Sequence, residues 1–139
     1  MAEISSKTQQ ITGRAGEDAA CAFLQSEGYT VLCRNYRAAH DEIDIIAETD
    51  QYIVFAEVKT RTERTVTRYG RPASAVTARK RRYLARAAEV YIKTHPSDKW
   101  YRFDVIEVWL SHDRVTGEGR YRFNHMKGVF GAGGRLGGL

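Results

Sequence analysis

The stretch 41–61, with the sequence DEIDIIAETDQYIVFAEVKTR, constrains the fold of this chain more than any other. Two short runs rich in isoleucine and valine, 42–48 and 53–59, carry acidic residues among the apolar ones. The polar residues 49–51 separate the two runs. Two runs of this kind around a polar turn predict a β-hairpin.

A hairpin whose turn is centred on Asp50 and Gln51 places particular side chains opposite one another. We expect Ile46 to lie opposite Phe55, and Asp44 to lie opposite Glu57. Directly opposed residues have Cβ atoms about 4.5–5.5 Å apart. Two carboxylates at that separation repel each other unless a cation lies between them. The pairing therefore predicts a cation site on an otherwise apolar hairpin.

A lysine follows the second acid at a fixed spacing. Asp44, Glu57 and Lys59 form the pattern Asp-x12-Glu-x-Lys. Side chains alternate between the faces of a strand, so Lys59 is expected about 7 Å from Glu57 on the same face. Another interpretation is a surface salt-bridge cluster in which Lys59 neutralises Glu42 across the hairpin. That interpretation leaves the pairing of Asp44 with Glu57 unexplained.

This pattern resembles the PD-(D/E)xK nuclease signature without its proline, and its spacing resembles that of archaeal Holliday-junction resolvases. The chain as a whole resembles the YraN-type (UPF0102) family of predicted endonucleases. The resemblance extends over about residues 13–110. Its motifs are Gly28-Tyr29, Glu42-Ile43-Asp44, Glu57-Val58-Lys59-Thr60-Arg61, Tyr69-Gly70-Arg71-Pro72 and Arg102-Phe103-Asp104.

The resemblance implies a deoxyribonuclease that depends on Mg²⁺ or Mn²⁺ and hydrolyses phosphodiester bonds in DNA, branched or junction structures included. Asp44, Glu57 and Lys59 would be the catalytic residues. Acidic residues that hold Mg²⁺ can supply an activated water and stabilise the charge of the phosphate. The metal would be held by Asp44, Glu57, the Val58 carbonyl and Glu17. Four-way junctions have twofold character, so a chain that cuts them is expected to act as a homodimer.

Glu17 has two interpretations. It lies on a partly apolar stripe of a helix expected over residues 13–28. At the start of that helix, the macrodipole favours a negative charge. Alternatively, Glu17 points toward the hairpin carboxylates and joins their metal site. The resemblance favours the second interpretation, because resolvase-like relatives use a first-helix glutamate in this way and Gly16-Glu17 matches the family motif.

A strongly basic segment follows the hairpin. Residues 61–82 contain eight arginines and lysines against one acid, Glu63. We expect an exposed loop over 60–72 and a long helix over 73–95. The residues expected to contact nucleic acid are Arg61, Arg64, Arg68, Tyr69, Arg71, Arg79 and Lys80. The alternative is a solvated loop that only promotes solubility.

Lys80 also has two interpretations, because it falls within the apolar stripe of the long helix. Its ammonium group could extend outward past an apolar contact, or it could reach the rim of the active site and bind a phosphate.

Asp41 departs from the family pattern, because YraN-type relatives usually carry glycine at this position. Aspartate tolerates unusual turn backbones, so we expect the turn to form with one more negative charge near the site.

The expected elements are a helix, three strands, a long helix and two strands. This order predicts an α/β fold of the restriction-endonuclease-like kind, with a mixed central sheet flanked by helices. After the hairpin, further strands are expected over 100–110 and 121–124. We expect one nuclease-like domain over 13–127, with a flexible N-terminus over 1–12 and a flexible Gly-rich tail over 128–139.

Composition limits the remaining possibilities. The net charge of +5 favours polyanionic partners. No apolar run reaches the length of about 18 residues that spans a bilayer, and no signal peptide is evident, so we expect a cytoplasmic protein without membrane contact. The two cysteines, Cys21 and Cys33, are expected to be reduced. The histidines lack zinc-ligand spacing, and no Walker-type phosphate loop is present.

A second function class remains open from the sequence alone. The chain could be a nucleic-acid-binding module that kept the fold without cutting, as part of a recombination, repair or DNA-uptake complex. Such a module would bind with a steep salt dependence that chelators do not change. Asp44 and Glu57 argue against it, because these carboxylates repel phosphates.

Overall fold

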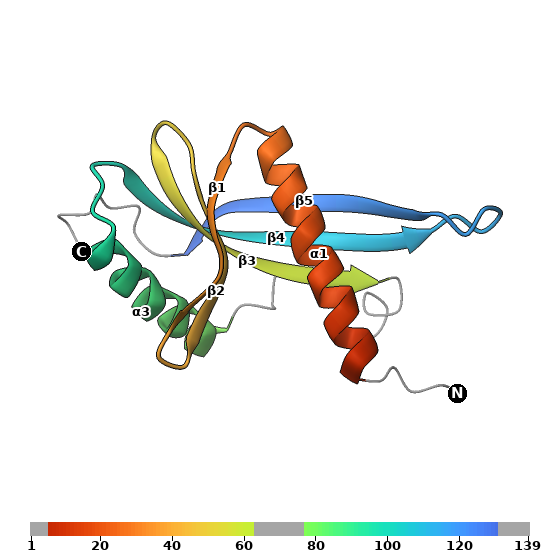
Figure 1. Cartoon of the computed structure of the whole chain (residues 1–139), viewed down its shortest axis with the longest axis horizontal. Coiled ribbons are helices and arrows are strands. Elements are labelled where there is room, and N and C mark those ends of the chain that lie inside the picture. The colour runs from red at the N-terminus through yellow and green to blue at the C-terminus, as the bar shows by residue number, and fades with distance from the viewer. Residues whose placement is uncertain (1–5, 63–76, 131–139) are drawn as a thin grey trace.

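The chain forms a mixed five-stranded sheet with a helix on each face in the computed structural model, which describes residues 6–62 and 77–130 (Figure 1). The order helix, three strands, helix, two strands confirms the expected α/β fold. The elements are α1 (Ser6–Ser26), β1 (Thr30–Ala38), β2 (Asp41–Glu48), β3 (Tyr52–Thr62), α3 (Ala78–Thr94), β4 (Trp100–His112) and β5 (Gly119–Phe130).

The strands lie in the sheet in chain order, β1-β2-β3-β4-β5. Only β3 and β4 run parallel among these neighbours, because the connection between them crosses over through α3. In the hairpin, Ile46 pairs with Phe55 and Glu48 with Ile53, which confirms the expected register. The ladder between β2 and β3 ends at the pair of Ile45 and Ala56.

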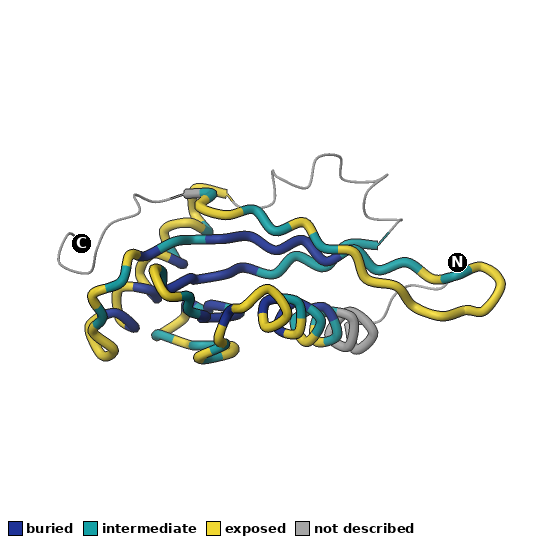
Figure 2. The backbone as a smooth tube through the Cα atoms, turned by 90° about the horizontal axis from the view of Figure 1, so that it is seen from above, coloured by how far each residue is buried: buried dark blue, intermediate teal, exposed yellow. Residues whose placement is uncertain are grey.

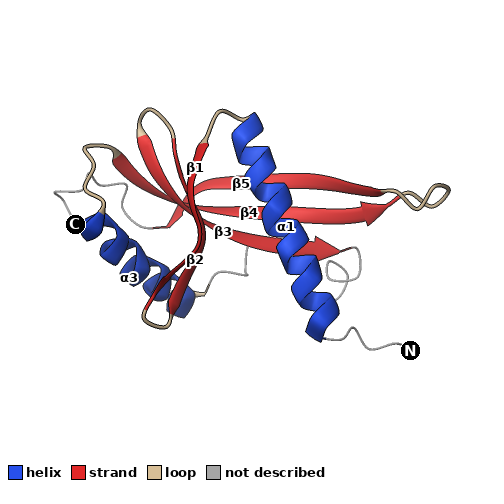
Figure 3. Ribbon diagram, in the orientation of Figure 1, coloured by secondary structure: helices blue, strands red, loops and turns tan. Residues whose placement is uncertain are grey.

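Alternation along β3 divides the core into two halves. Val54 and Ala56 face α1 and pack with Leu24. Phe55 faces the other way and packs with Leu84 and other residues of α3. Buried residues follow the middle strands in Figure 2, between exposed loops and helix surfaces. Figure 3 shows α1 crossing the sheet while α3 lies near the end of β2.

Both helices begin at other residues than expected. α1 begins at Ser6 rather than Gly13, because the preceding lysine and glutamines favour a helix and an interior glycine costs only about 1 kcal/mol. α3 begins at Ala78 rather than Ala73. Thr77 has extended backbone (φ −73°, ψ 164°), and its hydroxyl accepts a hydrogen bond from the Lys80 N–H, which caps the helix.

The last two strands are longer than expected and form a projecting hairpin. β5 begins at Gly119 and reaches Phe130, so it covers 121–124 and also the first residues of the expected tail. Gly128 has a left-handed φ of 62°, which suits a glycine, and its N–H donates to Asp104 at 3.0 Å. The hairpin extends beyond α1 in Figure 1. Neither helix in the described parts of the chain is long and apolar enough to cross a membrane.

Candidate carboxylate site

The site forms where β2 and β3 stop pairing. Beyond Ile45 and Ala56, the Val58 N–H donates to the Asp44 side chain at 2.8 Å. The Asp44 carboxylate thus receives a backbone N–H of the neighbouring strand. The sequence register placed Asp44 directly opposite Glu57. The ladder ends before that pair, but the Glu57 charge still acts on the Asp44 carboxylate.

Burial and like charge act together on Asp44. Burial and, after it, the negative charge of Glu57 together raise the pKa of Asp44 to about 7, against the opposing effect of the hydrogen bond from Val58. Glu57 itself is only 4% exposed. A buried pair of carboxylates gains stability by taking up a proton or a cation near neutral pH.

Two ammonium groups approach Glu57 from different elements. Lys59 of β3 places its Nζ atom 3.2 Å from Oε1 of Glu57, and Lys80 of α3 places its Nζ atom 3.5 Å from the same oxygen. Lys80 therefore lies at the rim of the site rather than extending outward. The other oxygen of Glu57, Oε2, is buried and has no hydrogen-bond partner among the residues that the structure describes.

The salt bridge between Lys59 and Glu42, which was the alternative interpretation of this hairpin, does not form among the described residues. The strands no longer pair at these positions, and Lys59 contacts Glu57 instead. Glu42 lies 3.8 Å from the guanidinium group of Arg37 on β1. The alternative of a cross-hairpin surface cluster is therefore wrong in its central contact.

Asn35 joins the acidic residues on the α1 side of the site. With its side-chain amide oriented to satisfy its neighbours, the nitrogen donates to Glu17 at 3.1 Å and to Glu42 at 3.0 Å. Burial raises the pKa of Glu17, and Arg34 and Asn35 oppose that shift. Sequence reasoning missed Asn35. Its left-handed φ of 52° is a conformation that asparagine tolerates, but a strand pattern does not reveal it.

Glu17 influences the site without joining Asp44 and Glu57 in one ligand set. Its charge helps to raise the pKa of Asp44. Within residues 6–62 and 77–130, however, no three acidic, histidine or cysteine side chains are placed to hold a metal ion together. Asp44 and Glu57 are therefore the core of the site, and Glu17 is a neighbour of it.

Gly16 fixes the distance between α1 and β3. A Cβ atom at Gly16 would overlap the hydroxyl oxygen of Thr60 and crowd the other side-chain atoms of that residue. Gly16→Ala should therefore lower the free energy of unfolding by about 1–3 kcal/mol. Gly13→Ala is the control, because a Cβ there meets no atom within 4 Å, and it should stabilise the helix by up to about 1 kcal/mol. Urea denaturation checks both variants, and equal effects would contradict the close approach.

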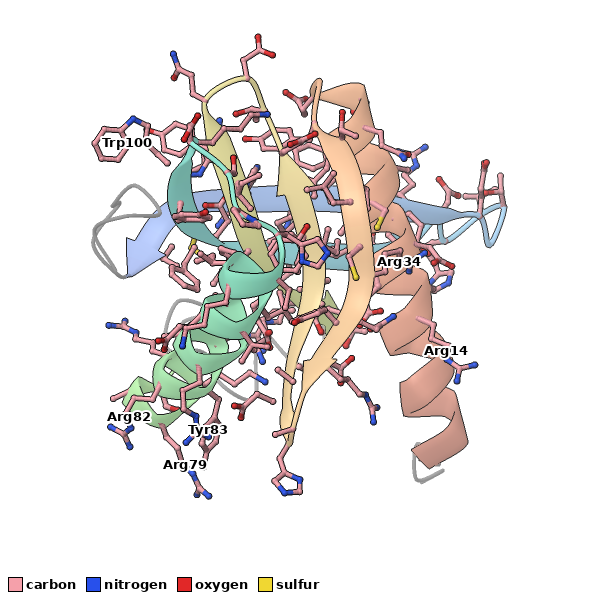
Figure 4. All side chains as sticks on the ribbon, turned by 60° about the vertical axis from the view of Figure 1, so that its left-hand side comes forward. Arg14, Arg34, Arg79, Arg82, Tyr83 and Trp100 are labelled. Carbon is pink, nitrogen blue, oxygen red and sulfur yellow. The ribbon has the colours of Figure 1, made fainter. Side chains whose placement is uncertain are left out.

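Basic side chains flank the site on two elements. Figure 4 shows Arg79, Arg82 and Tyr83 projecting from the N-terminal end of α3, with Arg14 and Arg34 on the α1 side. The Nε atom of Arg79 donates to the Tyr83 hydroxyl at 2.6 Å. Arg79 and Arg82 therefore provide positive charge at the N-terminal end of α3, whereas Arg34 on β1 is paired with Asp18 at 2.6 Å.

Of the residues expected to contact nucleic acid from the loop after the hairpin, the structure describes only Arg61. Arg61 lies in β3, not in a loop, and its Nε atom is 3.8 Å from the buried Glu107 carboxylate. β3 continues to Thr62 because it pairs along its whole length with β4, a long-range contact. The remaining residues, Arg64, Arg68, Tyr69 and Arg71, lie outside the described residues.

Asp41 does not direct its charge into the site. Both of its carboxylate oxygens lie 3.3 Å from guanidinium nitrogens of Arg86 on α3. The turn between β1 and β2 has its left-handed residue at Ala39, with φ 56°, so Asp41 needs no unusual backbone. The additional negative charge expected near the site is thus paired with a cation of α3.

The fold and site define an α/β protein in which the half-buried Asp44 and the buried Glu57 lie where β2 and β3 stop pairing, with two lysines beside Glu57. Residues 16–108 match the family described as "Uncharacterised protein family UPF0102". The chain belongs to this family, which is the YraN type.

Relatives align over most of the chain. A UPF0102 protein of Symbiobacterium thermophilum is 45% identical over 86% of this chain and 96% of its own length. A UPF0102 protein of Chloroherpeton thalassium is 45% identical over 73% of this chain and 78% of its own length. One from Bacteroides thetaiotaomicron is 38% identical over 85% of this chain and 90% of its own length.

Proposed function

We propose that this chain is a metal-dependent endonuclease that hydrolyses phosphodiester bonds in DNA. The observation that carries the proposal is the buried pairing of Asp44 with Glu57, which raises the pKa of Asp44 to about 7. The mutual repulsion of the two carboxylates destabilises the fold, although Lys59 and Lys80 partly compensate Glu57. A role in holding a cation gives the chain a reason to keep it.

The donor set fits Mg²⁺ or Mn²⁺. Mg²⁺ sites commonly use one or two carboxylates and leave other positions to water and substrate phosphate, so a full protein cage is not required. Asp44 and Glu57 would hold the ion, and within residues 6–62 and 77–130 the buried Oε2 atom of Glu57 has no hydrogen-bond partner. The Val58 carbonyl and a water held by Glu17 are further candidates. When bound, such an ion supplies an activated water and neutralises phosphate charge.

The chain's own residues would position the substrate around this pair. Lys59 carries its ammonium group beside Glu57, where it can orient a water or stabilise charge on a phosphate oxygen. Lys80 adds a second ammonium group from α3. Arg79 lies further out on the same helix and can contact a neighbouring phosphate.

The charge and the thiols of the chain support the remaining parts of the proposal. A net charge of +5 favours a polyanion such as DNA. Cys21 and Cys33 are free, as expected for a protein of the reducing cytoplasm. Branched DNA remains the proposed substrate form, and a homodimer would match the twofold character of a four-way junction.

One observation favours the alternative of a binding module without catalysis. Lys59 and Lys80 both approach the same oxygen of Glu57, so this carboxylate is already partly compensated without a metal. In that case chelators would leave DNA binding unchanged, and no metal would produce cleavage products.

Lys59→Ala separates the two functions. If the chain is a nuclease, this variant should lose about 10²–10³-fold in cleavage rate, because one ammonium group no longer stabilises the reacting phosphate. The assay uses labelled linear, flapped and four-way DNA with Mn²⁺, and EDTA as the metal-free arm.

Lys93→Ala is the matched control for this assay. The substitution removes the same charge from an exposed position near the end of α3, where Lys93 pairs with Glu89 at 3.3 Å. Cleavage that survives EDTA, or equal rates for both lysine variants, would sink the proposed mechanism.

A further inference from the structure

The face of the sheet that carries Glu57 continues onto the β4–β5 hairpin. Residues directly opposite in neighbouring strands share a face. Three rows result across β3, β4 and β5: Glu57, Val105 and Met126; Lys59, Glu107 and Asn124; Arg61, Trp109 and Arg122. Strand geometry separates neighbouring rows by about 7 Å, so the third row lies about 13 Å from the first.

Trp109, Arg120 and Arg122 form the outer part of this surface, which we call the arm face. The guanidinium carbon of Arg122 lies 5.6 Å from the centre of the Trp109 ring. Arg120 and Arg122 are exposed, and Trp109 is half-buried. A shallow depression on the hairpin is lined by these three residues together with Leu110, Ser111 and Tyr121.

The charge on the arm face is positive. Glu107 lies beneath the surface at 2% exposure, where Asn124 donates to it at 2.8 Å and Arg61 lies 3.8 Å away. Arg120 is 3.7 Å from Asp113 and so is partly compensated. No acidic side chain of the described residues forms an ion pair with Arg122. Arg122 is therefore the strongest candidate contact for an anion.

Neither described helix covers the arm face. α3 packs against β1 and β2 and against the rings around Phe55. α1 packs on the opposite face of the sheet, where Phe23 stacks on Phe123 with ring centres 4.5 Å apart. The hairpin projects beyond α1 in Figure 1.

We propose that the arm face binds a single strand of DNA that continues from the phosphodiester at the carboxylate site. Arg122 and Arg120 would contact phosphates, and an unpaired base would stack on the exposed part of the Trp109 ring. Arginines beside an aromatic ring on an open sheet face suit an unpaired strand, since stacking and backbone charge require no groove. The part of this proposal that places a phosphodiester of the same DNA strand at Asp44 and Glu57 rests on the proposed nuclease function.

Intrinsic fluorescence tests the stacking contact without any metal. The chain has two tryptophans, and Trp100 lies in a separate depression with Asp50, Gln51 and Lys99. In EDTA, Trp100→Phe should show quenched Trp109 emission when titrated with an oligothymidylate of about 16 nucleotides. Trp109→Phe, which keeps Trp100, should show no quenching. Saturation with DNA that leaves Trp109 emission unchanged would overturn the proposal.

Charge reversal tests the phosphate contact. Arg122→Glu should weaken binding of the oligonucleotide about tenfold and should lower the slope of log affinity against log salt by about 0.7, the loss of one phosphate contact. Lys93→Glu changes the net charge equally on α3 and should bind like the wild type. Equal weakening by both variants would overturn the proposal. Arg120→Glu is the second variant, and thermal melting checks that each protein is folded.

The outcomes separate this proposal from the proposed function. Metal-dependent cleavage with binding that ignores Arg122 would refute the arm face alone. Binding that depends on Arg122 and Trp109 in a protein that no metal makes cut DNA would refute the nuclease and leave the arm face as a binding surface. Absence of any DNA binding would refute the arm face.

Discussion

Asp44→Asn is expected to abolish cleavage and, at the same time, to stabilise the metal-free protein above neutral pH. Burial raises the pKa of Asp44 to about 7, and Glu57 contributes. In the unfolded chain the same carboxyl ionises near pH 3.9. Ionised Asp44 therefore destabilises the folded state, a penalty that grows as pH rises through this window and is complete above about pH 7. Asparagine can still accept the Val58 N–H without carrying the charge.

Asp44→Asn is expected to raise the free energy of unfolding by up to about 4 kcal/mol at pH 8 and by close to zero at about pH 4. Urea denaturation in EDTA at both pH values measures it. Asp50→Asn is the control, because Asp50 is an exposed turn residue. In a complementary experiment, Mn²⁺ should raise the melting temperature of the wild type and not of Asp44→Asn. Equal unfolding free energies of the variant and the wild type at pH 8 would refute the buried carboxylate pair.

A residue whose removal stabilises the protein is retained for something other than folding. Glu57 is buried as well, but Lys59 and Lys80 lie 3.2 and 3.5 Å from its Oε1 atom, so the argument applies to Asp44 rather than to Glu57. Sites that bind cations commonly oppose stability in this way, because their ligands repel one another until the ion arrives. The change in unfolding free energy caused by Asp44→Asn therefore tests a cation-binding role without requiring a known substrate.

The core of the site was predictable because it depends on local sequence. Alternation and a short polar turn determine the register of a hairpin, so the register of the paired part of β2 and β3 follows from residues 41–61 alone. The pairing of Ile46 with Phe55 confirms that register. The ladder's end before Asp44 was not predictable, since it depends on the Asp44 side chain accepting the Val58 N–H.

Contacts between elements distant in sequence were not predictable from local patterns. The position of Lys80 beside Glu57 depends on where α3 begins, and that depends on the cap at Thr77. Asp41 looked like an additional charge at the site until the fold placed Arg86 against it. Periodicity identifies which face of an element is apolar, but it does not tell which charged side chains meet across the core.

Substitution of Asp104 is expected to lower the free energy of unfolding more than any other change that we propose. Asp104 belongs to the Arg102-Phe103-Asp104 motif, and its contacts show what the motif does in the fold. Arg102 donates to its two oxygens from Nε and a terminal nitrogen, both at 2.9 Å, and Gly128 N–H donates at 3.0 Å. The His125 ring lies 2.6 Å away, and Arg102 also donates to the Tyr29 hydroxyl at 2.7 Å. This buried network joins β4, β5 and the start of β1 on the α1 side of the sheet.

Asp104→Asn should lower the free energy of unfolding by about 3–5 kcal/mol, because it leaves Arg102 buried without its partner. Burial raises the pKa of Asp104, but the hydrogen bonds from His125, Arg102 and Gly128 outweigh it and hold that pKa below its ordinary value. The wild type therefore has this stabilisation above the unfolded pKa of about 3.9 and loses it as pH falls through the lower folded value. Asp104→Asn should lack that acid transition.

Chemical denaturation between about pH 2 and pH 7 measures both effects. Asp113→Asn is the control, because Asp113 also has a lowered pKa but lies at the turn of the projecting hairpin, where it accepts from the Val115 and Thr116 N–H groups and lies 3.7 Å from the exposed Arg120. The folded fraction of Asp104→Asn should still bind and cut DNA, since the network lies on the face opposite Glu57. If Asp104→Asn were as stable as the wild type but no longer cut DNA, Asp104 would have a role in the reaction rather than in the stability of the fold.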